Sequence, residues 1–300
     1  MLAEGRAPVH YLAGHGTRRQ QAYHHAMNHL HMSGPRAVPA PIGQHIRNWR
    51  QRRRLSQQGL AQEAAVSTRH LSFIETGRAE PSREMVLRLA ERLDIPLRER
   101  NALLVAAGYA PMYRERPLDD PALASARVAV ELVLKGHEPY PSVALDRHYN
   151  VVAANRAVLL LLHGLPDSLL QAPMNVMRIS LHPQGLAARI ENLLQWRAHL
   201  FERLRQQIVA TADPGLQDLL DELKAYPVPA DASSQHLDGE HLGVAMPFRL
   251  RTPAGVLSFI GTVTIFGSAH DVTLQELMIE SSFPADAFTA AVLRQSATGY

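Results

Sequence analysis

The feature that most constrains this chain is the segment 57–75, in which small and apolar residues occupy the positions that a helix-turn-helix requires. Ala61 is a small residue at the point where the two helices would cross, and a close crossing requires a small side chain. The apolar residues placed to share one core are Leu60, Ala64, Val66, Leu71 and Ile74. In such a unit the outer face of the second helix can enter the major groove of DNA. The segment therefore predicts a DNA-binding motif.

The motif lies within a stretch that predicts five short helices. Apolar residues recur there at helical spacing, and the capping residues Ser56, Ser67 and Ser82 stand where helices would begin. The expected helices span 42–53, 57–64, 68–75, about 82–93 and about 96–108. They predict a compact all-helical N-terminal domain.

The charge of the chain is unevenly distributed. Its formal net charge is +3, but residues 41–114 hold 13 Arg against 7 Asp and Glu, a net charge of +6. Residues 115–300 carry a net charge of −6. A basic domain before an acidic one predicts a polyanion, such as double-stranded DNA, as the partner of the first domain only.

The residues expected to contact DNA follow from the motif. The outer face of the 68–75 helix offers polar or flat side chains to the bases: Thr68, Arg69, His70, Ser72 and Phe73. Arg69 is the strongest candidate for reading a base, with a phosphate contact as its alternative. Gln57 and Arg78 are expected to contact phosphates, and the run 50–54 to add electrostatic attraction. Glu75 is expected to accept hydrogen bonds from turn amides.

The rest of the chain predicts a mixed α+β domain. We expect a leader at 1–40, the helical domain at 41–110, a linker at 111–121 and a second domain at 122–297. The leader has no sustained period, and a flexible segment is a better interpretation of it than a metal site at His25 and His29. Met32 could be the natural start, which leaves open whether residues 1–31 belong to the natural protein.

Several elements are expected in the second domain. Helices are predicted over 122–135, 185–212 and 216–226, together with a short one capped by Asn155 and ending at His163. Strands are predicted at 143–146 and 149–154, and a hairpin at 244–251 and 256–266. Thr273 and Glu276 have the spacing of a capping box.

Composition and missing motifs exclude several classes of protein. The chain has no cysteine, which excludes disulfides and thiolate metal sites and favours a reducing compartment. No apolar run approaches the roughly 20 residues of a membrane span, so a cytoplasmic protein without membrane contact is expected. The common nucleophile, zinc-protease and nucleotide-binding motifs are absent, so we expect no enzyme, catalytic residue, metal or cofactor. The polar clusters at 236–241 and 270–271 lie in predicted turns without a nucleophile.

Residues 42–109 resemble the phage-repressor-like helix-turn-helix of the XRE family of bacterial regulators. The resemblance rests on Leu55-Ser56-Gln57, Leu60-Ala61 and Ile74-Glu75-Thr76-Gly77-Arg78. The segments 103–111, 138–141, 145–155 and 283–286 resemble the MmyB-like subgroup. Two positions depart from the pattern: Ala65 replaces the usual turn glycine, and Gly59 replaces a frequent Glu, which removes half of a capping box with Ser56.

The resemblance implies a PAS-like second domain that binds a small apolar ligand, with a fatty acid as the best candidate. It also implies a regulator that binds an operator, and two-fold operators favour a homodimer. The alternative is a second domain that only dimerises or binds a protein partner. A pocket would be lined from 143–145, 256–265 and the helix around Trp196. Trp196 could instead be core, and Arg178, His182 and Arg249 could pair with a ligand carboxylate or be surface or structural groups.

Overall fold

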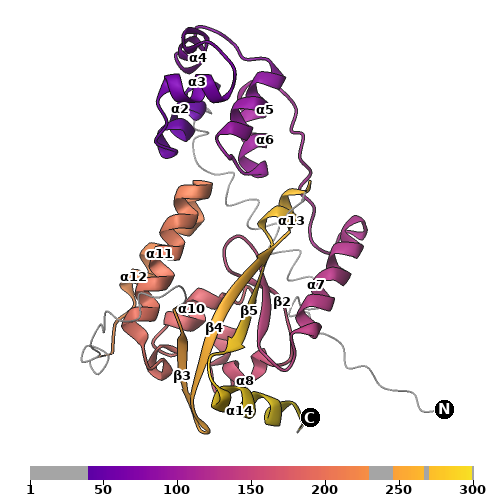
Figure 1. Cartoon of the computed structure of the whole chain (residues 1–300), viewed down its shortest axis with the longest axis vertical. Helices are drawn as coiled ribbons and strands as arrows, with labels where there is room; N and C mark the ends of the chain where they lie inside the picture. Colours follow the sequence, from indigo (N-terminus) through magenta and orange to yellow (C-terminus); the bar gives the residue numbers. More distant parts are fainter. Residues whose placement is uncertain (1–39, 230–245, 267–269, 299–300) are drawn as a thin grey trace, which may run out of the picture.

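The computed structural model describes residues 40–229, 246–266 and 270–298. Figure 1 shows a group of helices beside an α+β body built on one sheet. The helices of the first part are α2 (Ile42–Arg52), α3 (Gln57–Glu63), α4 (Thr68–Glu75), α5 (Arg83–Arg92) and α6 (Leu97–Ala106). These are the five helices that the sequence predicts, and the all-helical class of the first domain is confirmed.

Helices α3, α4 and α5 begin at the predicted serines, whereas α2 and α6 follow Pro41 and Pro96. Ser56, Ser67 and Ser82 each accept a hydrogen bond from the backbone N–H three residues on, at 2.9, 3.1 and 3.2 Å. The Ser56 side chain therefore still caps α3, although Gly59 has no side chain to form the reciprocal bond of a capping box. Ala65, in the turn between α3 and α4, adopts a φ of 53°, the left-handed conformation that glycine would take without strain.

The core of the first part joins all five helices. It includes the predicted anchors Leu60, Ala64, Leu71 and Ile74, with Val66 half-buried beside them. Gly43 lets α2 approach the end of α4, because a Cβ at this position would lie 2.2 Å from the carbonyl oxygen of Ile74. The packing holds α4 against α2 and α3, and the opposite face of α4 lies on the surface of the domain.

The second part is built on one antiparallel sheet of five strands. The strands are β1 (Ser142–Leu145), β2 (Val151–Ala154), β3 (Phe248–Thr252), β4 (Gly255–Ile265) and β5 (Met278–Pro284), in the order β2-β1-β5-β4-β3. The central strand β5 pairs with β1 and β4, which come from opposite ends of the domain sequence. The mixed α+β class is confirmed.

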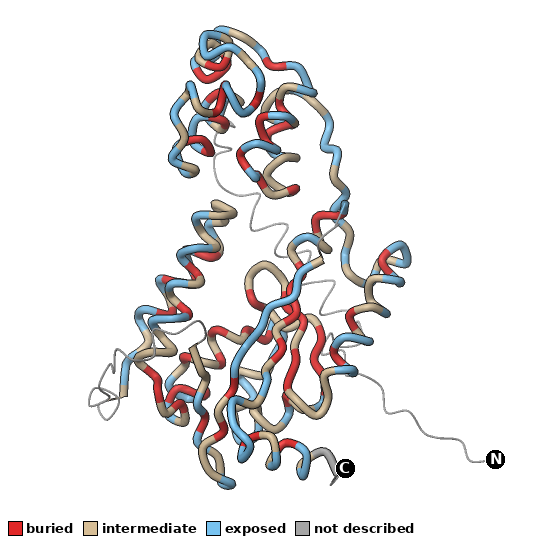
Figure 2. Tube along the Cα trace, viewed as in Figure 1, coloured by how far each residue is buried: buried red, intermediate tan, exposed pale blue. Residues whose placement is uncertain are grey.

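Helices cover both faces of this sheet. The longer ones are α7 (Ala124–Gly136), α11 (Leu193–Thr211), α12 (Pro214–Ala225) and α14 (Ala287–Thr298). The shorter ones are η1 (Pro121–Leu123), α8 (Val158–Leu162), α9 (Asp167–Leu170), α10 (Val176–Leu181), η2 (Ala187–Arg189) and α13 (Val272–Glu276). Buried segments run along the strands and the inner sides of these helices (Figure 2).

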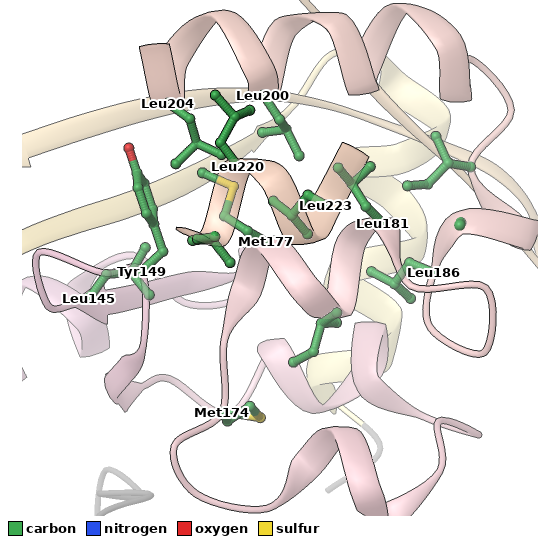
Figure 3. Packing of buried hydrophobic residues seen from close by; sticks show 14 of the residues in the cluster. Leu145, Tyr149, Met174, Met177, Leu181, Leu186, Leu200, Leu204, Leu220 and Leu223 are labelled. Atoms are coloured by element: carbon green, nitrogen blue, oxygen red, sulfur yellow. The ribbon is translucent and has the colours of Figure 1, made fainter. Parts of the chain in front are cut away.

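Alternation along the strands divides the core between the two faces. Leu145 and Met278 belong to the large cluster under α10, α11 and α12, whereas their neighbours Ala144 and Ile279 pack with α7. Figure 3 shows the large cluster, with Leu200 and Leu204 facing Met177 and Leu220.

Two predictions near the first hairpin are wrong. The second strand begins at Val151 and not at Tyr149, because Tyr149 has a φ of 66° in the turn and is buried. Asn155 does not cap α8. Its side chain accepts from Ser142 N and donates to the carbonyls of Leu134 and Tyr140, so it ties the strand to α7.

Two predictions about helix starts are also wrong. The expected helix 185–212 is interrupted, because Ile190 bridges to Leu250 and the Asn192 side chain holds the start of β3. Only α11 continues the predicted helix. At α13 the cap is Asp271, which accepts from Thr273 N at 3.0 Å, while the Thr273 hydroxyl donates to the carbonyl of Arg116.

Of the other elements, some were predicted and found, some predicted positions lie outside the described residues, and some elements were found without having been predicted. The helix 216–226 corresponds to α12, and the second hairpin to β3 and β4. The leader 1–39, the cluster 236–241 and positions 244–245 lie outside the described residues. Strand β5 and helices α9, α10 and α14 were not predicted.

Candidate DNA-binding surface and ligand cavity

The predicted reading face of α4 is on the outside of the helical domain. Thr68 and Arg69 are exposed, and His70, Ser72 and Phe73 are half-buried. The guanidinium groups of Arg69 and Arg78 lie 5.3 and 5.9 Å from the centre of the Phe73 ring. The ring thus holds two cations on one surface, and both remain exposed toward a polyanion.

Gln57 and Glu75 differ from expectation. The Gln57 side chain donates to Glu75 Oε2 at 2.8 Å, so its amide nitrogen is engaged inside the domain. Glu75 accepts from Arg50 Nε at 2.6 Å and Nη2 at 2.8 Å, and not from turn amides. Burial alone would raise the pKa of the Glu75 carboxyl, but the bonds from Arg50 and Gln57 bring that pKa below its ordinary value.

The arginine run 50–54 is only partly a solvated face. Arg50 is buried in its pair with Glu75, and Arg53 donates to the carbonyls of Leu93, Asp94 and Ala210. Arg52 and Arg54 are exposed. Two members of the run are therefore structural, and the others remain available for electrostatic attraction.

The second domain contains a cavity of about 380 Å³ between the sheet and its helices. Val143, Phe259 and Trp196 in its wall come from the three segments from which a pocket was expected. Other apolar lining residues include Val158, Leu161, Leu162, Met174, Val176, Ile179, Leu186, Met246 and Phe248. The volume falls within the range of small-molecule sites, roughly 300–1,000 Å³.

The wall also contains polar groups on α11 and the sheet. Trp196 stacks on His199 with 5.4 Å between ring centres and lies 4.9 Å from Phe248. Burial, and then the charge of Arg203, lower the pKa of His199, which keeps that ring neutral near pH 7. Arg203 forms an ion pair with Glu280 of β5, and both side chains line the cavity.

Of the four ligand residues predicted from the sequence, the structure brings only Trp196 to the cavity. Arg178 pairs with Glu222 at 2.8 and 2.7 Å, and the His182 ring lies against Tyr226 at 5.1 Å. Arg249 is exposed on β3. None of these three is among the residues that line the cavity.

Arg203 and Glu280 line the cavity but were not predicted from the sequence. Arg203 had a detectable signal, because Trp196, His199 and Arg203 recur at helical spacing on one face. Glu280 had none, because its strand was not predicted.

Within the described residues, hydrogen bonds join the helical domain to the α+β domain at two places. Gln275 Oε1 accepts from Leu97 N at 2.8 Å, and Glu276 accepts two bonds from Arg98 at 2.7 and 2.8 Å. At the other place, the Arg53 guanidinium donates to the carbonyl of Ala210 at 3.3 Å, near the end of α11. Ala212 packs against the core of the helical domain.

Two protein-family models match the chain. The model of the MmyB-like transcription regulator ligand binding domain matches residues 126–295, and that of a helix-turn-helix domain matches residues 41–103. No curated protein matches the chain. A solved structure titled "Structure of an RNA-binding Light-Oxygen-Voltage Receptor" is 14% identical over 94% of this chain and 69% of that one. Its TM-score of 0.24 is too low to support an argument.

The two family matches show a DNA-binding transcription regulator with a ligand-binding domain, a class of regulators and not of enzymes. The chain belongs to the family of MmyB-like transcription regulators, as the match over 126–295 shows. In the described part of the chain, no helix is long and apolar enough to cross a membrane. The same residues contain no cluster of three or more His, Asp or Glu that could hold a metal ion.

Proposed function

We propose that this regulator binds a two-fold operator as a homodimer, reads bases through α4, and senses a small apolar ligand, with a fatty acid as first candidate. The domains on which this rests are a leader at 1–40, the DNA-binding domain at 41–110, a linker at 111–121 and the ligand domain at 122–297. The family matches at 41–103 and 126–295 support this division.

The single observation that carries DNA reading is the exposed face of α4. It presents Thr68, Arg69, His70, Ser72 and Phe73 outward, while Leu71 and Ile74 anchor the helix in the core. Arg69 reads a base, since a guanidinium can donate to both acceptors of guanine. Arg78 follows the end of α4 and contacts phosphate. Gln57 contacts phosphate through its backbone N–H, because its side-chain amide is bonded to Glu75.

A comparison of two arginines tests these roles. Arg69→Ala should cost about 1–3 kcal/mol on an operator selected from random duplexes and relax the preference at one base pair. Arg78→Ala should weaken binding to selected and random DNA alike. Equal losses for both variants on both DNAs would show that Arg69 does not read a base.

Ligand sensing is supported by the largely apolar wall of the cavity. Each methylene buried there contributes about 0.8 kcal/mol, so affinity should rise with acyl length until the cavity is full and then fall. Titration of the full chain with saturated fatty acids of about 10 to 18 carbons tests this. A second domain that only dimerises would show no dependence on length.

A homodimer is favoured because one recognition helix reads only a few base pairs, and two half-sites multiply specificity. Sedimentation of the full chain with and without operator tests it. A monomer on DNA would contradict this part of the proposal.

A further inference from the structure

The wall of the cavity contains one ion pair, which joins a helix to the central strand of the sheet. Arg203 belongs to α11 and Glu280 to β5, and their side chains are 25% and 24% exposed. Among the described residues that line the cavity, these two are the only Arg, Lys, Asp or Glu side chains. An apolar ligand that enters the cavity must therefore lie close to this pair.

Arg203 can receive an acidic group. A guanidinium has five N–H donors, and the contacts of Arg203 include Glu280, the Met278 sulfur at 3.7 Å and the Tyr149 side chain, whose ring centre lies 5.0 Å away. A carboxylate takes two of these donors in a planar pair, which offsets the cost of leaving water. The same carboxylate repels Glu280, so the two acids compete for Arg203.

The elements that hold this pair also hold the DNA-binding domain. Arg203 precedes Ala210 by seven residues on α11, about 10 Å at 1.5 Å per residue, and Ala210 accepts the bond from Arg53. Glu280 lies in β5, which begins two residues after Glu276, the partner of Arg98. The pair thus joins α11 to β5. The end of α11 and the start of β5 are the parts of these elements that lie toward the helical domain (Figure 1).

A third connection runs through the turn under Arg203. Tyr149 is buried beside Leu145 (Figure 3), and Arg203 lies over its ring. From the same turn, Arg147 approaches Asp213 and Glu276 at 3.6 Å, and His148 contacts Asp213 at 2.9 Å. The turn 147–149 therefore contacts both Arg203 and the Glu276 that holds Arg98.

We propose that Arg203 binds the acidic head group of the ligand in competition with Glu280, and that opening this ion pair transmits ligand binding to the DNA-binding domain. This rests on the proposed sensing of a fatty acid, and it assigns the residues that hold and compete for its head group. Arg203 sets the specificity for the head group, and Glu280 is the internal competitor that holds α11 to β5 when no ligand is bound.

The test uses the full chain, with tetradecanoate and its methyl ester as probes. Calorimetry measures probe binding, and titration of a selected operator measures DNA affinity. The variants are Arg203→Gln and Glu280→Gln, with Arg203→Lys as a milder substitute should the first fail to fold. Arg205→Gln is the matched control, since Arg205 forms an exposed pair with Glu202 on the same helix.

We expect the wild-type chain to bind the acid at least tenfold more tightly than the ester. Arg203→Gln should abolish this preference and leave the ester unaffected, and Arg203→Lys should reduce it. Glu280→Gln should tighten acid binding and shift operator affinity without ligand in the direction in which the acid shifts the wild type. Arg205→Gln should match the wild type throughout.

Two results would overturn the inference. Equal affinity for acid and ester in the wild type would remove the head-group role, although length-dependent binding of both would leave the proposed sensing intact. A Glu280→Gln chain with wild-type operator affinity would remove the transmission role. Binding of neither probe would instead contradict the proposed sensing itself, and this inference with it.

Discussion

At the scale of single residues, the helical domain depends on one position without a side chain. Gly43 lies where α2 meets the backbone at the end of α4, and the nearest atoms to an added Cβ are the carbonyl oxygens of Ile74 and Glu75. Backbone atoms in a packed core cannot move aside as the end of a flexible side chain can.

Gly43→Ala should therefore lower the free energy of unfolding by about 1–3 kcal/mol, the usual cost of overpacking. Gly136→Ala is the control, because nothing lies within 4 Å of a Cβ at the end of α7. This control should change stability by no more than about 1 kcal/mol, in the stabilising direction. Urea unfolding followed by circular dichroism measures both, and a Gly43→Ala chain as stable as the wild type would contradict the packing argument.

The buried pair of Arg50 and Glu75 makes stability depend on pH. The folded pKa of Glu75 lies below its ordinary value, so its contribution is present above the unfolded pKa of roughly 4.3 and is lost as the pH falls through the folded pKa. Glu75→Gln leaves Arg50 without its charge partner and should cost about 3–5 kcal/mol at pH 7.

The difference between wild type and Glu75→Gln should shrink as the pH falls below the unfolded pKa of roughly 4.3, because the unfolded wild-type chain then binds a proton, and it is lost below the folded pKa, where the carboxyl is protonated in both states. Unfolding of both chains in urea across this range measures it. Glu202→Gln, which breaks an exposed pair, should cost at most about 1 kcal/mol. A difference that does not vary with pH would show that the Glu75 charge does not stabilise the domain.

At the scale of elements, the turn of the helix-turn-helix contains backbone strain. Ala65 adopts a φ of 53°, and a residue with a Cβ pays roughly 1–2 kcal/mol for that conformation. Its side chain is exposed, so a substitution there removes no core contact.

Ala65→Gly should raise the stability of the domain by roughly 0.5–1 kcal/mol and leave operator affinity unchanged, since the residue is off the reading face. Ala64→Gly is the matched control. Ala64 is buried and has a φ of −85°, so glycine there should destabilise by about 1 kcal/mol. Thermal unfolding of both variants checks the opposite signs, and a loss of stability in Ala65→Gly would refute the strain.

The elements also show what could be predicted from sequence. The helices α2 to α6 were predictable because their apolar residues recur locally, and α3, α4 and α5 also begin at serine caps. Strand β5 was not, because Met278–Pro284 contains Glu280 and two serines and is held as a strand by pairing with β1 and β4. Helix α11 starts late because Ile190 and Asn192 are bound by β3, a contact between distant segments.

The residues of the candidate site were likewise predictable only where the signal is local in the sequence. Trp196 could be found from its helix, but Arg178, His182 and Arg249 were chosen for charge and lie away from the cavity. Arg178 pairs with Glu222 from another helix, which no local pattern reveals.

At the scale of the whole molecule, a basic domain that binds DNA is joined to an acidic one that contains the cavity. Two elements of the ligand domain, α11 and the α13–β5 segment, contact the helical domain directly. If the ligand and the operator each bind two placements of these elements with different affinity, the ligand must change operator affinity, and the operator must change ligand affinity by the same factor.

The most direct test of this account is the affinity of the full chain for tetradecanoate with and without saturating operator, measured by calorimetry. The account predicts that the operator changes this affinity by a factor of roughly 5–150, the usual range of coupling between two sites. Titrating the operator at saturating acid should give the same factor. Acid binding that is identical with and without operator would contradict the claim that the cavity controls DNA binding.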